Sequence, residues 1–188
     1  MEVLKTLVRQ SLPILVLCIM GEIAAGIFLM NIDKYTELLP GLIILVPSVM
    51  GTRGNILGIF TSRLASGLHL GTITPNLRRN KVLKENAMAM LALTVVVSLL
   101  TGVAAHLSTV ILGFTSMGIL RFAFVSFMTG FMTDFVMIIV STIIGIFSFK
   151  LKADPDNVTI PLVTTISDFT SITFLLLSVQ VVLLLFPL

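Results

Sequence analysis

The chain has 188 residues, of which 56% are hydrophobic and only 11% are charged. An ordinary soluble domain carries about 25% charged residues, so this composition excludes that class and indicates an integral membrane protein. The formal net charge of +3 does not predict a nucleic-acid partner, because the basic residues form short clusters between apolar runs, where they set membrane topology. The single cysteine, Cys18, excludes an internal disulfide or a thiolate metal site.

The first part of the chain predicts two membrane spans. Residues 1–10 suit a short interfacial helix, and residues 12–30 are enough to cross an apolar core of about 30 Å. The second apolar segment, residues 39–67, is too long for one straight span, and it contains Pro47 and the Gly-Thr-Arg-Gly stretch at 51–54. We expect this helix to be broken near 51–54. Because irregular backbone at membrane depth is tolerated only inside protein or beside a wet cavity, the break is a candidate part of an ion path.

Three further apolar segments follow, at residues 85–107, 121–149 and 161–186. Pro161 can occupy the first turn of the last helix, where its missing N–H is no loss. The sequence therefore predicts an all-α integral membrane protein with five transmembrane helices. It forms a single transmembrane domain over residues 1–188, with no room for a soluble regulatory domain.

The basic residues predict the orientation. If the spans alternate, nine of them lie on one side of the membrane and only Lys34 and Arg121 on the other. Lysine and arginine favour the cytoplasmic side, so we expect a multi-pass protein of the cell membrane with a cytoplasmic N-terminus and an external C-terminus. The nine are Lys5, Arg9, Arg63, Arg78, Arg79, Lys81, Lys84, Lys150 and Lys152.

Two carboxylates lie inside predicted spans. A charged side chain at the centre of a membrane helix costs about 2.5–3.5 kcal/mol on insertion scales, so it requires a partner, water or an ion. Asp168 comes seven residues after Pro161, and Asp134 comes thirteen residues into a span that enters from the other side. At 1.5 Å per residue these positions are about 10 Å and about 20 Å deep, which in a core of about 30 Å is the same layer.

Other polar groups lie near this layer. Asn55 reaches a similar depth if its segment is roughly straight, and Glu22 lies near the midplane of the first span. Helical spacing places Thr164 and Thr165 on the polar side of the last helix with Asp168. A small, partly polar stripe also follows the fourth span, formed by Ser126, Gly130, Thr133, Met137 and Ser141.

Carboxylates, hydroxyls and an amide without histidine or cysteine are hard oxygen ligands, which suit Mg²⁺, Ca²⁺ or Mn²⁺ rather than zinc or copper. Mg²⁺ usually keeps several waters, so one or two carboxylates with outer-shell contacts to Thr164, Thr165 and Asn55 could hold it. Structural alternatives are open: Asp168 or Asp134 could pair with Arg53 or cap a broken helix. Glu22 could equally form a structural pair with Arg53.

Two stretches also resemble a known family. Pro47-Ser-Val-Met-Gly-Thr-Arg-Gly-Asn55 followed by Thr61-Ser-Arg-Leu-Ala65 resembles the glycine-asparagine signature in the second span of the MgtE-type magnesium transporters and channels. Asp154-Pro155 and then Pro161-Leu-Val-Thr-Thr-Ile-Ser-Asp168 are similar to that family's motif at the fourth loop and fifth span. The resemblance covers essentially the whole chain in order.

The resemblance implies a two-fold homodimer of five-span subunits with a central pore between them. In that arrangement Asp168 of each subunit would face a hydrated magnesium ion, Asp154 would lie at the cytoplasmic mouth, and Asn55 and Asp134 would match polar positions near the pore. The sequence shows no counterpart of the soluble regulatory domains of the bacterial members, so we expect the chain to correspond to a membrane domain alone. It is closer in build to archaeal permease-like relatives or to one half of the duplicated MgtE-like solute carriers.

The sequence therefore predicts a divalent cation transporter or channel, most consistent with Mg²⁺, that moves a largely hydrated ion through a pore lined by intramembrane carboxylates. The metal would be met by Asp168, Asp134, Thr164, Thr165, Asn55, Asp154 and Glu22, and no other cofactor is expected. One alternative is a proton- or sodium-coupled cation exporter, and another is a non-transporting structural membrane subunit. We do not expect an enzyme, because no nucleophile–base pair or histidine set for a metal is visible.

Overall fold

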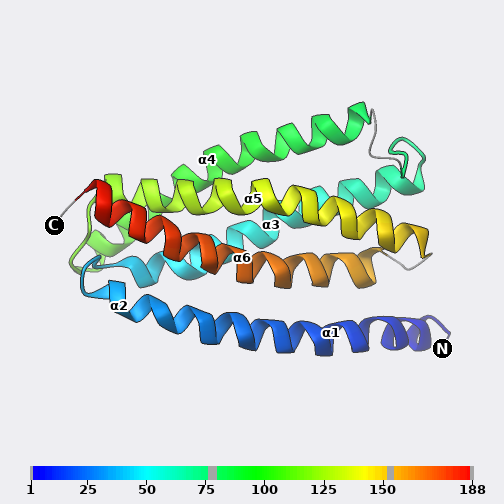
Figure 1. Cartoon of the computed structure of the whole chain (residues 1–188), viewed down its shortest axis with the longest axis horizontal. Coiled ribbons are helices and arrows are strands. Elements are labelled where there is room, and N and C mark those ends of the chain that lie inside the picture. The colour runs from blue at the N-terminus through cyan, green and yellow to red at the C-terminus, as the bar shows by residue number, and fades with distance from the viewer. Residues whose placement is uncertain (1, 76–79, 152–154, 187–188) are drawn as a thin grey trace.

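The computed structural model describes residues 2–75, 80–151 and 155–186, and these residues form helices and short connections without strands. Five long helices lie side by side with the two ends of the chain at opposite ends of the bundle (Figure 1). All five are long and apolar enough to cross a membrane, which confirms the predicted count. The elements are α1 (Glu2–Leu29), η1 (Met30–Ile32), α2 (Asp33–Thr36), α3 (Leu42–His69), α4 (Lys81–Ile111), α5 (Ile119–Lys150) and α6 (Pro155–Leu185).

Helix α5 is the centre of the bundle, since it packs against α3, α4 and α6. Helix α1 lies at the edge and packs mainly against α6 (Figure 1). Most of its side chains are therefore exposed along the membrane-spanning part. An apolar helix with so little protein around it needs lipid or another protein surface on its remaining sides.

The predicted break in the second span is wrong. Helix α3 runs without interruption through Gly51 and Gly54, and Pro47 lies inside it. Glycine and proline are tolerated in membrane helices when side chains and neighbouring helices satisfy the backbone. Here Ser48 and Thr52 donate hydrogen bonds to carbonyl oxygens one turn earlier, at 3.3 Å and 2.8 Å. At 28 residues the helix is about 42 Å long, so it accommodates its length by tilting or protruding.

Two helix starts also differ from the prediction. Helix α1 begins at Glu2, so residues 2–10 continue into the first span instead of forming the separate interfacial helix predicted for residues 1–10. Helix α6 begins at Pro155, which places Pro161 inside the helix instead of in its first turn. Apolar periodicity does not reveal these extensions, because polar residues beyond the hydrocarbon core can remain helical in the headgroup region.

A polar layer divides the apolar core into two clusters. One cluster includes Leu42, Phe122 and Val179, and the other includes Leu57, Met90 and Val163. Between them along α3 and α5 come Arg53 and Asp134, which are 1% and 0% exposed. The two charged residues are thus buried inside the chain at mid-depth of the bundle.

Candidate functional site: two charged pairs at mid-membrane depth

The first pair joins α3 to α5. Nη1 of Arg53 donates to Oδ2 of Asp134 at 2.6 Å, in an ion pair with both side chains almost fully buried. Arg53 lies eleven residues into α3 and Asp134 fifteen residues into α5, so each is about 16–22 Å from the start of its helix. In low dielectric this attraction offsets the cost of removing both charges from water only when further hydrogen bonds support it.

Helix α4 supplies those hydrogen bonds. The hydroxyl of Thr94 donates to Oδ2 of Asp134, and Nη2 of Arg53 donates to the hydroxyl of Ser98 at 3.1 Å. A side chain at Gly130 would collide with this network, because an added Cβ would meet Nη1 of Arg53 at 2.8 Å and would also overlap the hydroxyl of Ser98. These hydrogen bonds and the ion pair connect α3, α4 and α5 through the side chains of Arg53, Asp134, Thr94 and Ser98.

This arrangement decides between the partners that the sequence left open for Arg53. Arg53 pairs with Asp134, and the alternative Glu22–Arg53 pair is not formed. Oδ2 of Asp134 is engaged by the guanidinium, while Oδ1 is buried without a hydrogen-bond partner among the described residues. A guanidinium 2.6 Å from the carboxylate neutralises the charge that a metal ion would need.

The second pair joins α1 to α6. Glu22 and Asp168 are neighbours across this contact, where α1 approaches α6 closely beside Gly21 and Thr165. Two contacts fix the register of α1 against α6: an added Cβ on Gly21 would meet Cγ2 of Thr165 at 2.5 Å, and the rings of Phe28 and Phe169 stack at 5.4 Å. Tyr35 of α2 continues the same order, since its hydroxyl accepts from Nε2 of Gln180 at 3.1 Å, so the two helices run parallel. The absence of a side chain at Gly21 allows the approach that brings the acids together.

The two pairs differ in exposure. Glu22 is exposed and Asp168 is half-buried, whereas Arg53 and Asp134 are fully buried inside the chain. Glu22 lies eleven residues into a candidate span that covers 11–36, which places it about 16 Å from the start of that span. This acid pair is open on one side and has no basic partner among the described residues.

The remaining predicted residues lie in different surroundings. Thr165 lies beside Gly21 and therefore next to the acid pair. The hydroxyl of Thr164 donates to carbonyl oxygens of its own helix, at 3.1 Å to Ile160 and 2.9 Å to Pro161. Asn55 is exposed on α3. Asp154 lies outside the described residues.

The polar stripe predicted on the fourth span is buried in α5. Ser126 donates to the carbonyl oxygen of Ser98 at 2.7 Å. Thr129, which was not part of the predicted stripe, donates to the hydroxyl of Ser178 at 3.2 Å. The hydroxyl of Thr133 has no partner among the described residues. Buried polar groups of this kind are commonly satisfied by internal water, so this stripe stabilises packing between helices and can also hold water.

Sequence reasoning missed the contribution of α4. Thr94 and Ser98 lie one helical turn apart and face α5, together with Thr101, Gly102 and Ala105 on the same buried side. The spacing of these small and polar residues in an otherwise apolar span was a signal for a helix–helix interface with interhelical hydrogen bonds.

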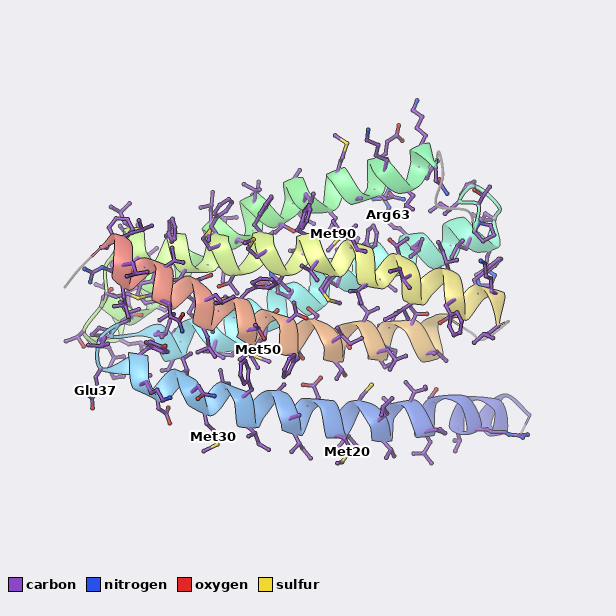
Figure 2. All side chains as sticks on the ribbon, viewed as in Figure 1. Met20, Met30, Glu37, Met50, Arg63 and Met90 are labelled. Atoms are coloured by element: carbon purple, nitrogen blue, oxygen red, sulfur yellow. The ribbon has the colours of Figure 1, made fainter. Side chains whose placement is uncertain are left out.

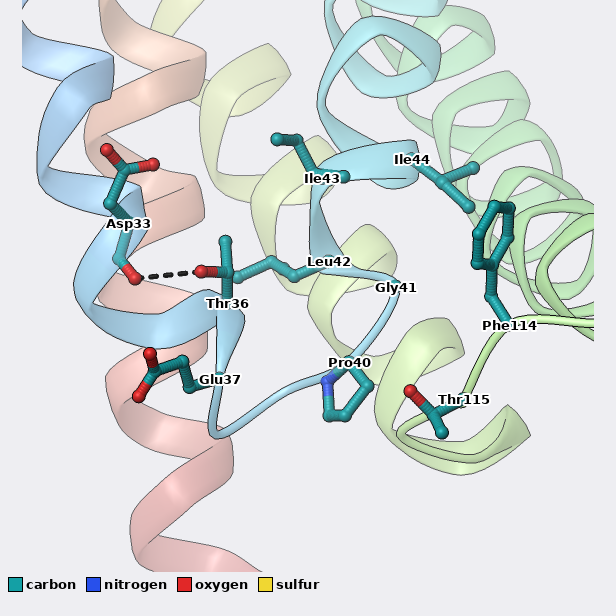
Figure 3. A pocket seen from close by; sticks show the side chains of 10 residues that line it. All are labelled: Asp33, Thr36, Glu37, Pro40, Gly41, Leu42, Ile43, Ile44, Phe114 and Thr115. Carbon is teal, nitrogen blue, oxygen red and sulfur yellow. Dashed lines mark hydrogen bonds between the residues drawn. The ribbon is translucent and has the colours of Figure 1, made fainter.

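A cleft lies at the end of the bundle that carries the C-terminus (Figure 1 and Figure 3). It has a volume of about 630 Å³ and lies between α2, the start of α3 and the α4–α5 connection. Asp33 and Glu37 line it with Thr36, whose hydroxyl donates to the carbonyl oxygen of Asp33 at 2.8 Å. Both acids are exposed. This cleft is separate in sequence from the mid-membrane acids.

Comparison with known proteins agrees with the resemblance. Residues 46–178 match the MgtE family of divalent cation transporters. The chain belongs to the MgtE family. It is 26% identical over 184 residues to solute carrier family 41 member 3 of Rattus norvegicus, a match that covers 94% of this chain and 39% of the rat protein. The chain therefore spans about two fifths of the length of the rat protein that it matches.

Proposed function

We propose that this protein transports Mg²⁺ as a largely hydrated ion that is held, midway across the membrane, by Glu22 and Asp168. The single observation that carries the proposal is the close approach of α1 and α6 at Gly21 and Thr165, which brings Glu22 and Asp168 together on the open side of the two helices. Like charges so close repel each other, and a divalent cation between them relieves both charges. Membership of a family of divalent cation transporters supports the same conclusion.

The ligand set favours an ion that keeps its water. Among the described residues there is no group of three or more histidine, cysteine or acidic side chains that could enclose a bare metal. Mg²⁺ dehydrates reluctantly and is usually bound through one or two carboxylates and several waters. Two acids with the hydroxyls of Thr164 and Thr165 nearby on α6 suit such an ion better than a softer metal.

We assign Asp134 a structural role in place of the ligand role that the sequence predicts. Its Oδ2 accepts from Arg53 and Thr94, and the guanidinium already compensates its charge. A cation passing close to Arg53 would meet a positive charge, so the ion path runs on the α1–α6 side. Asp154 is proposed, from the family resemblance alone, to lie at the mouth of the path.

We further propose that two copies form the transporter. Glu22 and Asn55 are exposed at mid-depth, and Asn55 has no hydrogen-bond partner among the described residues. A polar group facing lipid at this depth is costly, so a partner protein or a wet cavity is expected to cover it. A second copy that faces the first across a two-fold axis would cover these residues with protein and could enclose a wet cavity between the copies. The N-terminus of each copy would lie in the cytoplasm, as the basic residues predict.

Flux into proteoliposomes tests the function. Purified protein is reconstituted with a magnesium-sensitive dye inside the vesicles, and external Mg²⁺ is added with and without a proton or sodium gradient. We expect dye response with the native chain and its loss with Asp168→Asn. Unchanged Mg²⁺ flux in that variant would reject the role of Asp168, and flux only under an imposed gradient would replace a passive path with a coupled exporter.

A further inference from the structure

A narrow groove opens between α3 and α4 on the side of the bundle away from α1. Its volume is about 70 Å³, and its walls are mainly apolar. Polar groups come from Arg63 of α3 and Asn86 of α4. The apolar lining residues are Ile56, Ile59 and Phe60 on α3, and Ala89, Met90 and Leu93 on α4.

The polar and apolar parts lie at different depths. Arg63 is six residues before the end of α3 and Asn86 is five residues after the start of α4, so both are about 8–9 Å inside the ends that face the same connection. The apolar residues continue from there toward mid-membrane, and Met90 lies deeper than Arg63 in Figure 2. Because α3 is about 42 Å long against a core of about 30 Å, this depth is close to the boundary between headgroups and hydrocarbon.

Arg63 has no counter-ion in the part of the chain that the structure describes. The ion pairs within that part are Arg53–Asp134 and the exposed Lys81–Glu85. Arg63 is exposed, and Asn86 is half-buried beside it and makes no side-chain hydrogen bond to another described residue. Lys84 adds positive charge at the same end of α4. An arginine at the headgroup boundary, above an apolar groove, is complementary to an amphipathic anion.

We propose that this groove binds an anionic phospholipid, with the phosphate on Arg63 and Asn86 and one acyl chain along the groove. The guanidinium offers two parallel N–H donors to phosphate oxygens, which is the geometry that arginine provides better than lysine. The groove is too small to enclose a headgroup, so the headgroup lies at its mouth and only a stretch of chain enters. This site is independent of the proposed ion path, because neither Glu22 nor Asp168 contributes to it.

Spin-labelled lipid association tests the proposal. The full chain is reconstituted in phosphatidylcholine vesicles, and the fraction of motionally restricted label is compared for spin-labelled phosphatidylglycerol and phosphatidylcholine. We expect selectivity for phosphatidylglycerol in the native chain. Arg63→Gln should reduce this selectivity about five-fold, which matches the attraction of one basic residue for an anionic membrane surface. Arg63→Lys should retain only part of it.

Two matched variants distinguish a specific lipid-binding site from nonspecific attraction of anionic lipid by the positive charge at this end of the bundle. Lys84→Gln removes the same charge from the same end of the bundle but from outside the groove, so phosphatidylglycerol selectivity should persist. Ala89→Phe fills the groove and should reduce selectivity while leaving all charges in place. Equal loss in Arg63→Gln and Lys84→Gln, or unchanged selectivity in Arg63→Gln, would overturn the proposal. Competition by soluble inorganic phosphate would also overturn it, since the acyl chain would then be unnecessary.

Discussion

Arg53 and Asp134, which are 81 residues apart in sequence, form an ion pair of 2.6 Å at the centre of the bundle. The pair fixes the rotation of α3 about its own axis. Asn55 follows Arg53 by two residues, which is about 200° around a helix, so inward anchoring of Arg53 turns Asn55 outward. The buried ion pair thereby directs an uncharged polar residue to the exposed surface of α3.

Replacing one member of this pair by an apolar residue should lower the stability of the protein more than replacing both members. Arg53→Met or Asp134→Leu alone leaves a buried charge without its partner, which costs about 3–5 kcal/mol. The double variant removes both charges and replaces them with apolar side chains. Thermal unfolding in detergent should therefore show large losses for each single variant and recovery for the double variant. Independent, additive losses would show that the two residues do not act as a pair.

Gly130 should tolerate substitution poorly. An added methyl group would meet Nη1 of Arg53 at 2.8 Å, so Gly130→Ala should lower the unfolding temperature by disturbing the ion pair. Gly54→Ala is the matched control, because its added Cβ meets nothing within 4 Å. Alanine favours helix over glycine by about 1 kcal/mol, so the control should be neutral or more stable. Equal stability of the two variants would contradict the close packing around Arg53.

Gly21 should control the approach of the two acids. Gly21→Val would push α1 away from Thr165, since its Cβ would lie 2.5 Å from the methyl carbon of that residue. Mg²⁺ flux should fall while the unfolding temperature changes little, because α1 is a peripheral helix that packs mainly on α6. Gly26→Val carries the same side chain where the added Cβ meets nothing within 4 Å. Equal flux in both variants would show that the spacing of α1 and α6 is unimportant.

The composition and the apolar runs were sufficient to predict five membrane-spanning helices. Hydrophobicity over about 20 residues is a strong signal because a bilayer allows few alternatives to a helix. Hydrophobicity does not reveal whether the helix is continuous through residues 51–54, and the predicted break there is not found. Glycine there lowers helix propensity, but the surrounding helices and the hydroxyls of Ser48 and Thr52 preserve the helical conformation.

The depth of the polar residues was also readable from the sequence, whereas their pairing was not. Rise per residue placed Glu22, Asp134 and Asp168 near mid-membrane, but depth alone leaves the side on which each residue faces undetermined. Which acid meets Arg53 depends on the rotation and packing of separate helices. That packing depends on Ser98 and Gly130, whose roles appear only when α4 and α5 are in contact with α3.

The face of α3 that carries Asn55 should meet a second copy. In a Cys18→Ala background, Asn55→Cys should form a cross-linked dimer when oxidised in the membrane. Val96→Cys places a thiol on the exposed side of α4, where 56% of the side chain is accessible, and should remain uncross-linked. Gel electrophoresis without reducing agent distinguishes these outcomes. Cross-linking at position 96 and not at 55 would place the interface on the opposite face.

Binding of Mn²⁺, a paramagnetic substitute for Mg²⁺, tests the role of the acid pair most directly. Electron spin resonance counts free Mn²⁺ in the presence of the purified protein, so bound ion is obtained by difference. Glu22→Gln and Asp168→Asn should each weaken binding that Mg²⁺ displaces, while Glu85→Gln, which removes an exposed acid near the start of α4, should leave it unchanged. Full Mn²⁺ binding in the double variant Glu22→Gln with Asp168→Asn would contradict the proposed site.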